Sequence, residues 1–168
     1  MLLAARVLVV AAMLALVVPT AAVGRGNPVT SPKLWATVNV CDTPGQPDSI
    51  GVRASMPGTG HRGDRMYMRI RVDYLDPATQ SWLPIGADGD SGRFYVGAAT
   101  HPVRQGGMSF AYAPPATGAT TLRGDVTFQW RRKSRVVYRA EKVTEPGHPD
   151  ASQSDPPGYS AATCAIQP

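Results

Sequence analysis

The nine residues MYMRIRVDY at positions 66–74 decide the fold class of this chain. Apolar side chains and one tyrosine occupy the even positions, whereas arginine, aspartate and Tyr67 occupy the odd positions. Alternation with a period of two indicates a β-strand that has one face in a core and the other in water. A protein built around this strand is expected to bury its methionines and to expose its arginines.

The same alternation returns on both sides of this stretch, between clusters of turn residues. Further strands are expected near residues 33–41, 50–56, 81–85, 93–96, 108–112, 126–130, 135–143 and 159–166. In the strand at 126–130, the alternation assigns Trp130 to the core. The chain has 17 Gly and 16 Pro, which suits short strands joined by turns. The sequence therefore predicts an all-β fold, an immunoglobulin-like antiparallel β-sandwich of about eight strands, with a small barrel as the alternative.

The first residues have the pattern of an export signal. Arg6 precedes the apolar run VLVVAAMLALVV at 7–18, and PTAA follows at 19–22. We expect a signal peptide over residues 1–22, cleaved after Ala22. An uncleaved membrane anchor is the alternative, although the run is shorter than the roughly 20 residues of a spanning helix.

The chain behind this segment has the length of a single domain. We expect a linker over residues 23–32 and one β-sandwich domain over residues 33–168. No second apolar stretch is long enough to span a membrane, so no stable membrane span is expected after cleavage. The expected location is outside the cytoplasm, either secreted or at the exterior of the cell envelope.

Two cysteines lie close to the ends of the expected domain, Cys41 in its first strand and Cys164 in its last. Exported proteins meet oxidising conditions, so the simplest expectation is one disulfide that joins the first strand to the last. Two free thiols or a cross-link to a partner are the alternatives.

The segment TEPGHPDASQSDPPG, at residues 144–158, interrupts the strand pattern before the last cysteine. It is rich in proline, aspartate and serine and has no apolar periodicity. Such a composition is typical of a long exposed loop.

Positive charge gathers at one expected hairpin. The whole chain has 17 basic and 12 acidic residues, and the hairpin carries Arg131, Arg132, Lys133 and Arg135. Guanidinium and ammonium groups bind phosphate and sulfate, so these four residues are a candidate polyanion-binding site. The alternative is that they protect a strand edge from pairing with other chains. The expected partner is an envelope polyanion or another extracellular protein, and not a specific nucleic acid, because no exposed aromatic residues alternate with the charges.

One short motif resembles a catalytic sequence. GDSG at residues 89–92 matches the sequence around the nucleophile of trypsin-like proteases. A nucleophilic serine needs a histidine base that a carboxylate orients. None of His61, His101 and His148 has a sequence context that resembles the histidine of that family. No catalytic residue is assigned, and the alternative function is a small extracellular hydrolase that uses loop residues near Asp90 and Ser91, such as Asp88 and His101.

Two aspartates of the same segment could begin a calcium loop. Asp88 and Asp90 have the opening spacing of an EF-hand, but the later ligand positions hold Gly92, Arg93 and Ala99. No metal site and no cofactor are predicted, and an irregular calcium loop is the remaining alternative.

Three segments resemble the small exported β-domains of high-GC actinobacteria: LWATVNVCDTPG (34–45), VTFQWRR (126–132) and GYSAATCAI (158–166). In architecture, the strand pattern over residues 33–166 resembles immunoglobulin and fibronectin type III domains. Antibody-type domains differ because their disulfide joins two central strands. The resemblance implies a β-sandwich outside the cytoplasm and supplies no functional residues. The expected function is a secreted binding or structural module at the cell envelope or outside the cell, and not an enzyme.

Overall fold

The computed structural model describes residues 26–168, so the expected signal peptide and its cleavage site lie outside the described residues. The strands are β1 (Trp35–Thr43), β2 (Gln46–Pro57), β3 (Asp64–Asp76), β4 (Ser81–Pro84), β5 (Asp90–Ala98), β6 (Val103–Ala111), β7 (Thr120–Arg132), β8 (Arg135–Val143) and β9 (Cys164–Ile166). Two 3-10 helices, η1 (Pro28–Thr30) and η2 (Ala87–Gly89), complete the regular structure. No helix of the described residues is both long and apolar enough to cross a membrane. The predicted all-β class is confirmed, although the last strand is shorter than predicted.

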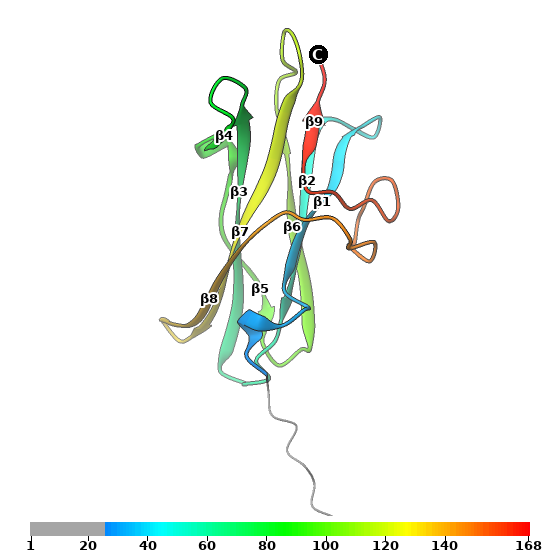
Figure 1. Cartoon of the computed structure of the whole chain (residues 1–168). Coiled ribbons are helices and arrows are strands. Elements are labelled where there is room, and N and C mark those ends of the chain that lie inside the picture. The colour runs from blue at the N-terminus through cyan, green and yellow to red at the C-terminus, as the bar shows by residue number, and fades with distance from the viewer. Residues whose placement is uncertain (1–25) are drawn as a thin grey trace, which may run out of the picture.

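The strands form two antiparallel sheets that lie face to face (Figure 1). The smaller sheet has the strand order β1-β2-β6. The larger sheet has six strands in the order β4-β3-β7-β8, with β5 also paired to β3 and β9 also paired to β7. This arrangement confirms the predicted antiparallel sandwich.

The core lies between the two sheets, and β3 contributes to it with the periodicity of its sequence. The inward residues of β3, each at most 1% exposed, are Met66, Met68, Ile70 and Val72. The inward residues of β2 in the opposite sheet are Ile50, Val52, Ala54 and Met56. Trp130 of β7 is fully buried, as its position in the alternation predicts. Removal of this apolar surface from water is the main force that holds the sheets together.

The predicted disulfide is present between Cys41 of β1 and Cys164 of β9, whose Cα atoms lie 5.2 Å apart. β1 belongs to the smaller sheet and β9 to the larger one. The bond therefore joins the two sheets along one edge, and it joins the first strand to the last as expected.

The chain between β8 and β9, residues 144–163, lies against the smaller sheet, and we call it the C-terminal strap. Figure 1 shows it crossing from the end of β8 toward β1 and β2. Val38 and Ala161 exchange backbone hydrogen bonds of 2.9 and 3.0 Å. On the other edge of this sheet, the Gln105 amide of β6 donates to the backbone oxygen of Asp150 at 3.1 Å. The strap therefore bridges β1 and β6 across the outer face of the smaller sheet.

The strap explains why polar residues of β1 are buried. Thr37 is 0% exposed and Asn39 is 2% exposed, and Nδ2 of Asn39 donates to two strap carbonyls. Most residues of the predicted loop at 144–158 are exposed, yet Thr144 and Ala151 are buried. The segment is a loop without regular strands, and its backbone is attached to the sheet.

The described part of the expected linker, residues 26–32, is in contact with the domain. Pro28 of η1 is buried, and Val29 packs against the core. Residues 28 and 29 therefore belong to the folded domain rather than to a linker.

Candidate functional sites

The GDSG segment forms a β-bulge between β3 and β5. Arg69 pairs with Arg93 and Arg71 pairs with Asp90, so β5 places two residues, Ser91 and Gly92, opposite the single residue Ile70 of β3. Gly92, one of these two, has a φ of +61°, a conformation that suits glycine. The motif therefore has a backbone explanation.

The polar groups of this bulge are engaged in local structure. The Ser91 hydroxyl accepts from Ile70 N at 2.8 Å and donates to Gly92 O at 2.7 Å. The Asp90 carboxylate accepts three hydrogen bonds from Arg69. Two come from Nε, to Oδ1 at 2.8 Å and to Oδ2 at 3.1 Å, and the third comes from Nη2 to Oδ2. The Arg69 hydrogen bonds outweigh the effect of burial and lower the pKa of Asp90 to about 2. The hydrogen bonds of the Ser91 hydroxyl among the described residues go to the backbone, and none of them joins it to a histidine.

The described residues contain no group of three or more His, Cys, Asp or Glu side chains placed to hold a metal ion.

The four residues of the predicted polyanion site at the hairpin lie in two environments: two contact other groups of the domain, and two are exposed at the turn. Arg132 donates from Nε to Asp64 Oδ1 at 2.7 Å. Arg131 donates to Gln129 Oε1 at 3.0 Å and to the backbone oxygen of Ser134. Lys133 and Arg135 are exposed at the turn. Arg131 and Arg132 are therefore held by contacts within the domain, whereas Lys133 and Arg135 extend into solvent.

Asp64 is the buried partner in this ion pair. Its side chain is 0% exposed, and Thr59 Oγ1 also donates to it at 2.8 Å. Burial opposes ionisation, but the hydrogen bonds from Arg132 and Thr59 and the charge of Arg132 outweigh it, so the pKa of Asp64 lies below its ordinary value. The carboxylate therefore stabilises the folded state in its ionised form.

Asp64→Asn should reduce the free energy of unfolding at neutral pH by about 1–3 kcal/mol, because a charged hydrogen bond at a buried carboxylate is lost. The folded pKa is depressed, so this stabilisation is present above the unfolded pKa of about 3.9 and disappears as the pH falls through the folded value. Urea unfolding of both proteins at pH 7 and at stepwise lower pH measures the difference. The difference should shrink on acidification, and a constant difference would contradict the role of ionisation. Glu141→Gln, at an exposed ion pair with Arg139, is the matched control and should cost under about 1 kcal/mol.

The largest concentration of positive charge lies on the outer face of the larger sheet. Residues directly opposite on antiparallel strands share a face, and Arg69 lies opposite Arg93, Arg65 opposite Arg131. We call the following set the arginine face: Arg65, Arg69, Arg71, Arg93, Arg123, Arg131 and Arg139. It spans β5, β3, β7 and β8, four neighbouring strands of one sheet.

Carboxylates neutralise part of this face. The four ion pairs are Arg69–Asp90, Arg71–Asp125, Arg123–Asp73 and Arg139–Glu141. Arg65, Arg93 and Arg131 are in none of the ion pairs of the described residues. The face therefore keeps an excess of positive charge, and three of its guanidiniums have no carboxylate partner.

Two tyrosines hold two of these guanidiniums in place. Arg65 lies over the ring of Tyr95 at 5.8 Å, and Arg93 lies over the ring of Tyr67 at 5.5 Å. The tyrosine rings are themselves 5.5 Å apart. Beside them is a hollow of about 170 Å³, lined by residues that include Arg69, Arg93, Arg139, Tyr67 and Gln129. Stacking restricts the guanidiniums, so less conformational entropy is lost when an anion binds.

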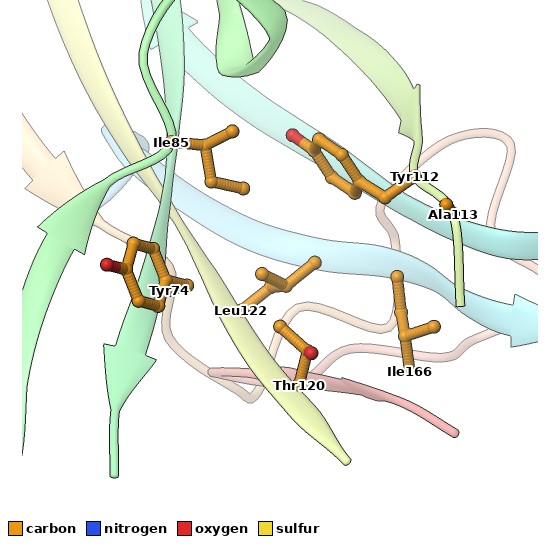
Figure 2. A pocket seen from close by; sticks show the side chains of 7 residues that line it. All are labelled: Tyr74, Ile85, Tyr112, Ala113, Thr120, Leu122 and Ile166. Carbon is orange, nitrogen blue, oxygen red and sulfur yellow. The ribbon is translucent and has the colours of Figure 1, made fainter. Parts of the chain in front are cut away.

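A second hollow, of about 270 Å³, opens at one end of the sandwich (Figure 2). Its lining residues are Tyr74, Ile85, Tyr112, Ala113, Thr120, Leu122 and Ile166. The hydroxyl end of Tyr112 points toward Ile85, and burial followed by the charge of Asp88 raises the pKa of Tyr112 to about 12. The lining carries no charged side chain.

The fold and these surfaces define a disulfide-closed antiparallel β-sandwich with one arginine-rich sheet face. No protein-family model matches the chain, and no curated protein sequence is significantly similar to it.

Proposed function

We propose that this protein is an exported binding module that holds an anionic polymer of the cell envelope against its arginine face. The observation that carries the proposal is the excess of guanidinium groups on one face of four strands, three of them without a carboxylate partner among the described residues. Guanidinium is the side-chain group best suited to bidentate binding of phosphate, sulfate and carboxylate.

The features of the face favour a polymer over a single small ion. Its charges extend along β3 from Arg65 to Arg71, and a strand rises about 3.3 Å for each residue. A chain with regularly spaced anionic groups would therefore meet several guanidiniums at once. A binding role also suits Asp90 and Ser91, whose polar groups are occupied by Arg69 and by the backbone.

Export and the immunoglobulin-like class belong to the same proposal. The disulfide between Cys41 and Cys164 fits an oxidising compartment. Two antiparallel sheets face to face, with short connections between most strands, support the immunoglobulin-like assignment.

The arginine face should bind inorganic polyphosphate, a probe that carries charge without sugar or carboxylate groups. Replacing Arg65 and Arg93 together with methionine should weaken binding at low salt roughly 10- to 100-fold, because two contacts of about 1 kcal/mol or more are lost. The slope of log K against log salt concentration should become shallower by about 1.4, at about 0.7 for each contact on a flexible strand. Fluorescence anisotropy with labelled polyphosphate measures both quantities.

The control is the pair Lys133→Met and Arg135→Met, which removes the same charge from the exposed hairpin turn. This variant should keep most of the affinity, since those residues lie outside the arginine face. Loss of binding in the hairpin variant alone would move the site to the hairpin. Absence of salt-sensitive binding by the wild-type protein would refute the proposal.

A further inference from the structure

A second arginine-centred site lies on the opposite side of the molecule, on the outer face of the smaller sheet. Arg53 of β2 stands between Thr37 of β1 and Gly107 of β6, which are its neighbours in register. It is partly buried beside the C-terminal strap, where its Nη2 donates to Gln153 Oε1.

The guanidinium of Arg53 lies against bare backbone. A Cβ added at Gly107 would be 3.0 Å from Cζ and from Nε of Arg53, and 2.4 Å from the carbonyl oxygen of Val52. Any larger residue at position 107 would displace the side chain. The glycine of β6 and the amide of the strap therefore hold this arginine in one position.

The charge of Arg53 has no counter-charge nearby. None of the ion pairs of the described residues includes it, and its buried Nε has no hydrogen-bond partner. Burial alone lowers the pKa of Arg53 from its ordinary value, with no contribution from a neighbouring charge. The group still carries its proton at neutral pH. A partly buried cation without an anion is costly, and an anionic ligand would relieve that cost.

The surroundings of this cation are polar and uncharged. A hollow of about 290 Å³ is lined by Asn39, Val40, Gln46, Arg53, Ser109 and Gln153. Small-molecule sites have volumes from about 300 Å³ upward, so this hollow is close to the smallest of them. A hollow of this size suits a ligand as small as one sugar ring. Amide and hydroxyl groups exchange hydrogen bonds with hydroxyls of a ligand.

We propose that this hollow binds a sugar acid, with its carboxylate on the Arg53 guanidinium and its hydroxyls on the side chains of Asn39, Gln46 and Ser109. The single cation matches a single negative charge, and the planar fork of arginine matches a planar carboxylate. An apolar ligand is disfavoured because the lining is mainly amide and hydroxyl groups. This site is separate from the arginine face, since it lies on the other sheet.

The test is an NMR titration of the folded, oxidised protein with sodium glucuronate. Glucuronate should shift the amide signals of Gly51 and Gly107 and saturate with a dissociation constant of about 0.1–10 mM. Glucose, which lacks the carboxylate, and inorganic phosphate, which lacks the ring hydroxyls, should each bind at least about tenfold more weakly. A response to phosphate equal to that of glucuronate, or no saturable response to glucuronate, would overturn the proposal.

Two variants locate the site. Arg53→Met should weaken glucuronate binding roughly 10- to 100-fold, and Arg53→Lys should recover part of it, because lysine keeps the charge and loses the fork. Gln153→Glu places a carboxylate of the same shape against Arg53, so it should abolish glucuronate binding while the melting temperature stays equal or rises. This second variant keeps the proposal testable if Arg53→Met does not fold.

The matched control is Arg93→Met, which removes an arginine of the arginine face. It should leave glucuronate binding unchanged while polyphosphate binding falls. Gln153→Glu, by contrast, should abolish glucuronate binding and leave polyphosphate binding unchanged. Failure of one proposal is thereby distinguishable from failure of the other. Glucuronate binding that persists in Gln153→Glu would show that Arg53 does not hold the carboxylate.

Discussion

Replacing Cys41 and Cys164 together with alanine should lower the free energy of unfolding by roughly 4–5 kcal/mol. The bond closes a loop with a sequence separation of 123 residues, and the chain-entropy model assigns about this value to a loop of that length. The bond is also the covalent link between the two sheets at the β1 and β9 edge, so its loss leaves only non-covalent contacts between these two strands. Urea unfolding followed by tryptophan fluorescence measures the change.

Reduction of the wild-type protein with dithiothreitol is the matched control, because it breaks the bond without altering side-chain volume. Reduced wild-type protein and the double variant should unfold at similar urea concentrations. A loss below about 1 kcal/mol in both would mean that the strap and β9 remain attached without the bond, contrary to the expected loop-closure effect.

The fold could be predicted because its information is local. The alternation at residues 66–74 appears in β3 with the predicted face buried, and Trp130 lies in the core where the parity of its strand places it. The C-terminal strap could not be predicted in the same way. Its contacts use isolated backbone groups and side chains of distant strands, such as Asn39 and Gln105, which leave no periodic trace in residues 144–158.

The candidate sites depend on register, which the sequence does not display. The alternation at residues 66–74 predicts that Arg69 and Arg71 face solvent. Arg93 lies beside them only because β5 pairs with β3 at that position. A shift by one residue would place Arg93 on the other face. The ion pair of Arg132 was hidden for a similar reason, since its partner Asp64 lies 68 residues away.

The site at Arg53 depends even more on contacts between distant segments, which the sequence does not display. Its three determinants come from β2, from Gly107 in β6 and from Gln153 in the strap. A lone arginine in an alternating strand is most simply a solvent-facing charge. Only the bare glycine and the strap make it a partly buried cation with a hollow beside it.

Trp130→Ala should have the largest effect of any core substitution, a loss of about 3–5 kcal/mol in the free energy of unfolding. Trp130 is the largest of the fully buried side chains. Its indole Nε1 donates to the backbone oxygen of Pro57 at 2.8 Å, which ties β7 of the larger sheet to the end of β2 in the smaller one. Alanine would remove both the packing and this link between the sheets.

A more conservative change separates the two contributions. Trp130→Phe keeps an aromatic ring against Tyr138, whose ring lies 6.2 Å away, but it removes the hydrogen bond to Pro57, so it should cost about 1–3 kcal/mol. Trp82→Ala is the control, because Trp82 is partly exposed beneath Arg123 and should cost under about 1.5 kcal/mol. Chemical unfolding followed by circular dichroism measures all three. Equal losses for Trp130→Ala and Trp82→Ala would show that the indole does not join the sheets, because the prediction rests on full burial and on the bond to Pro57.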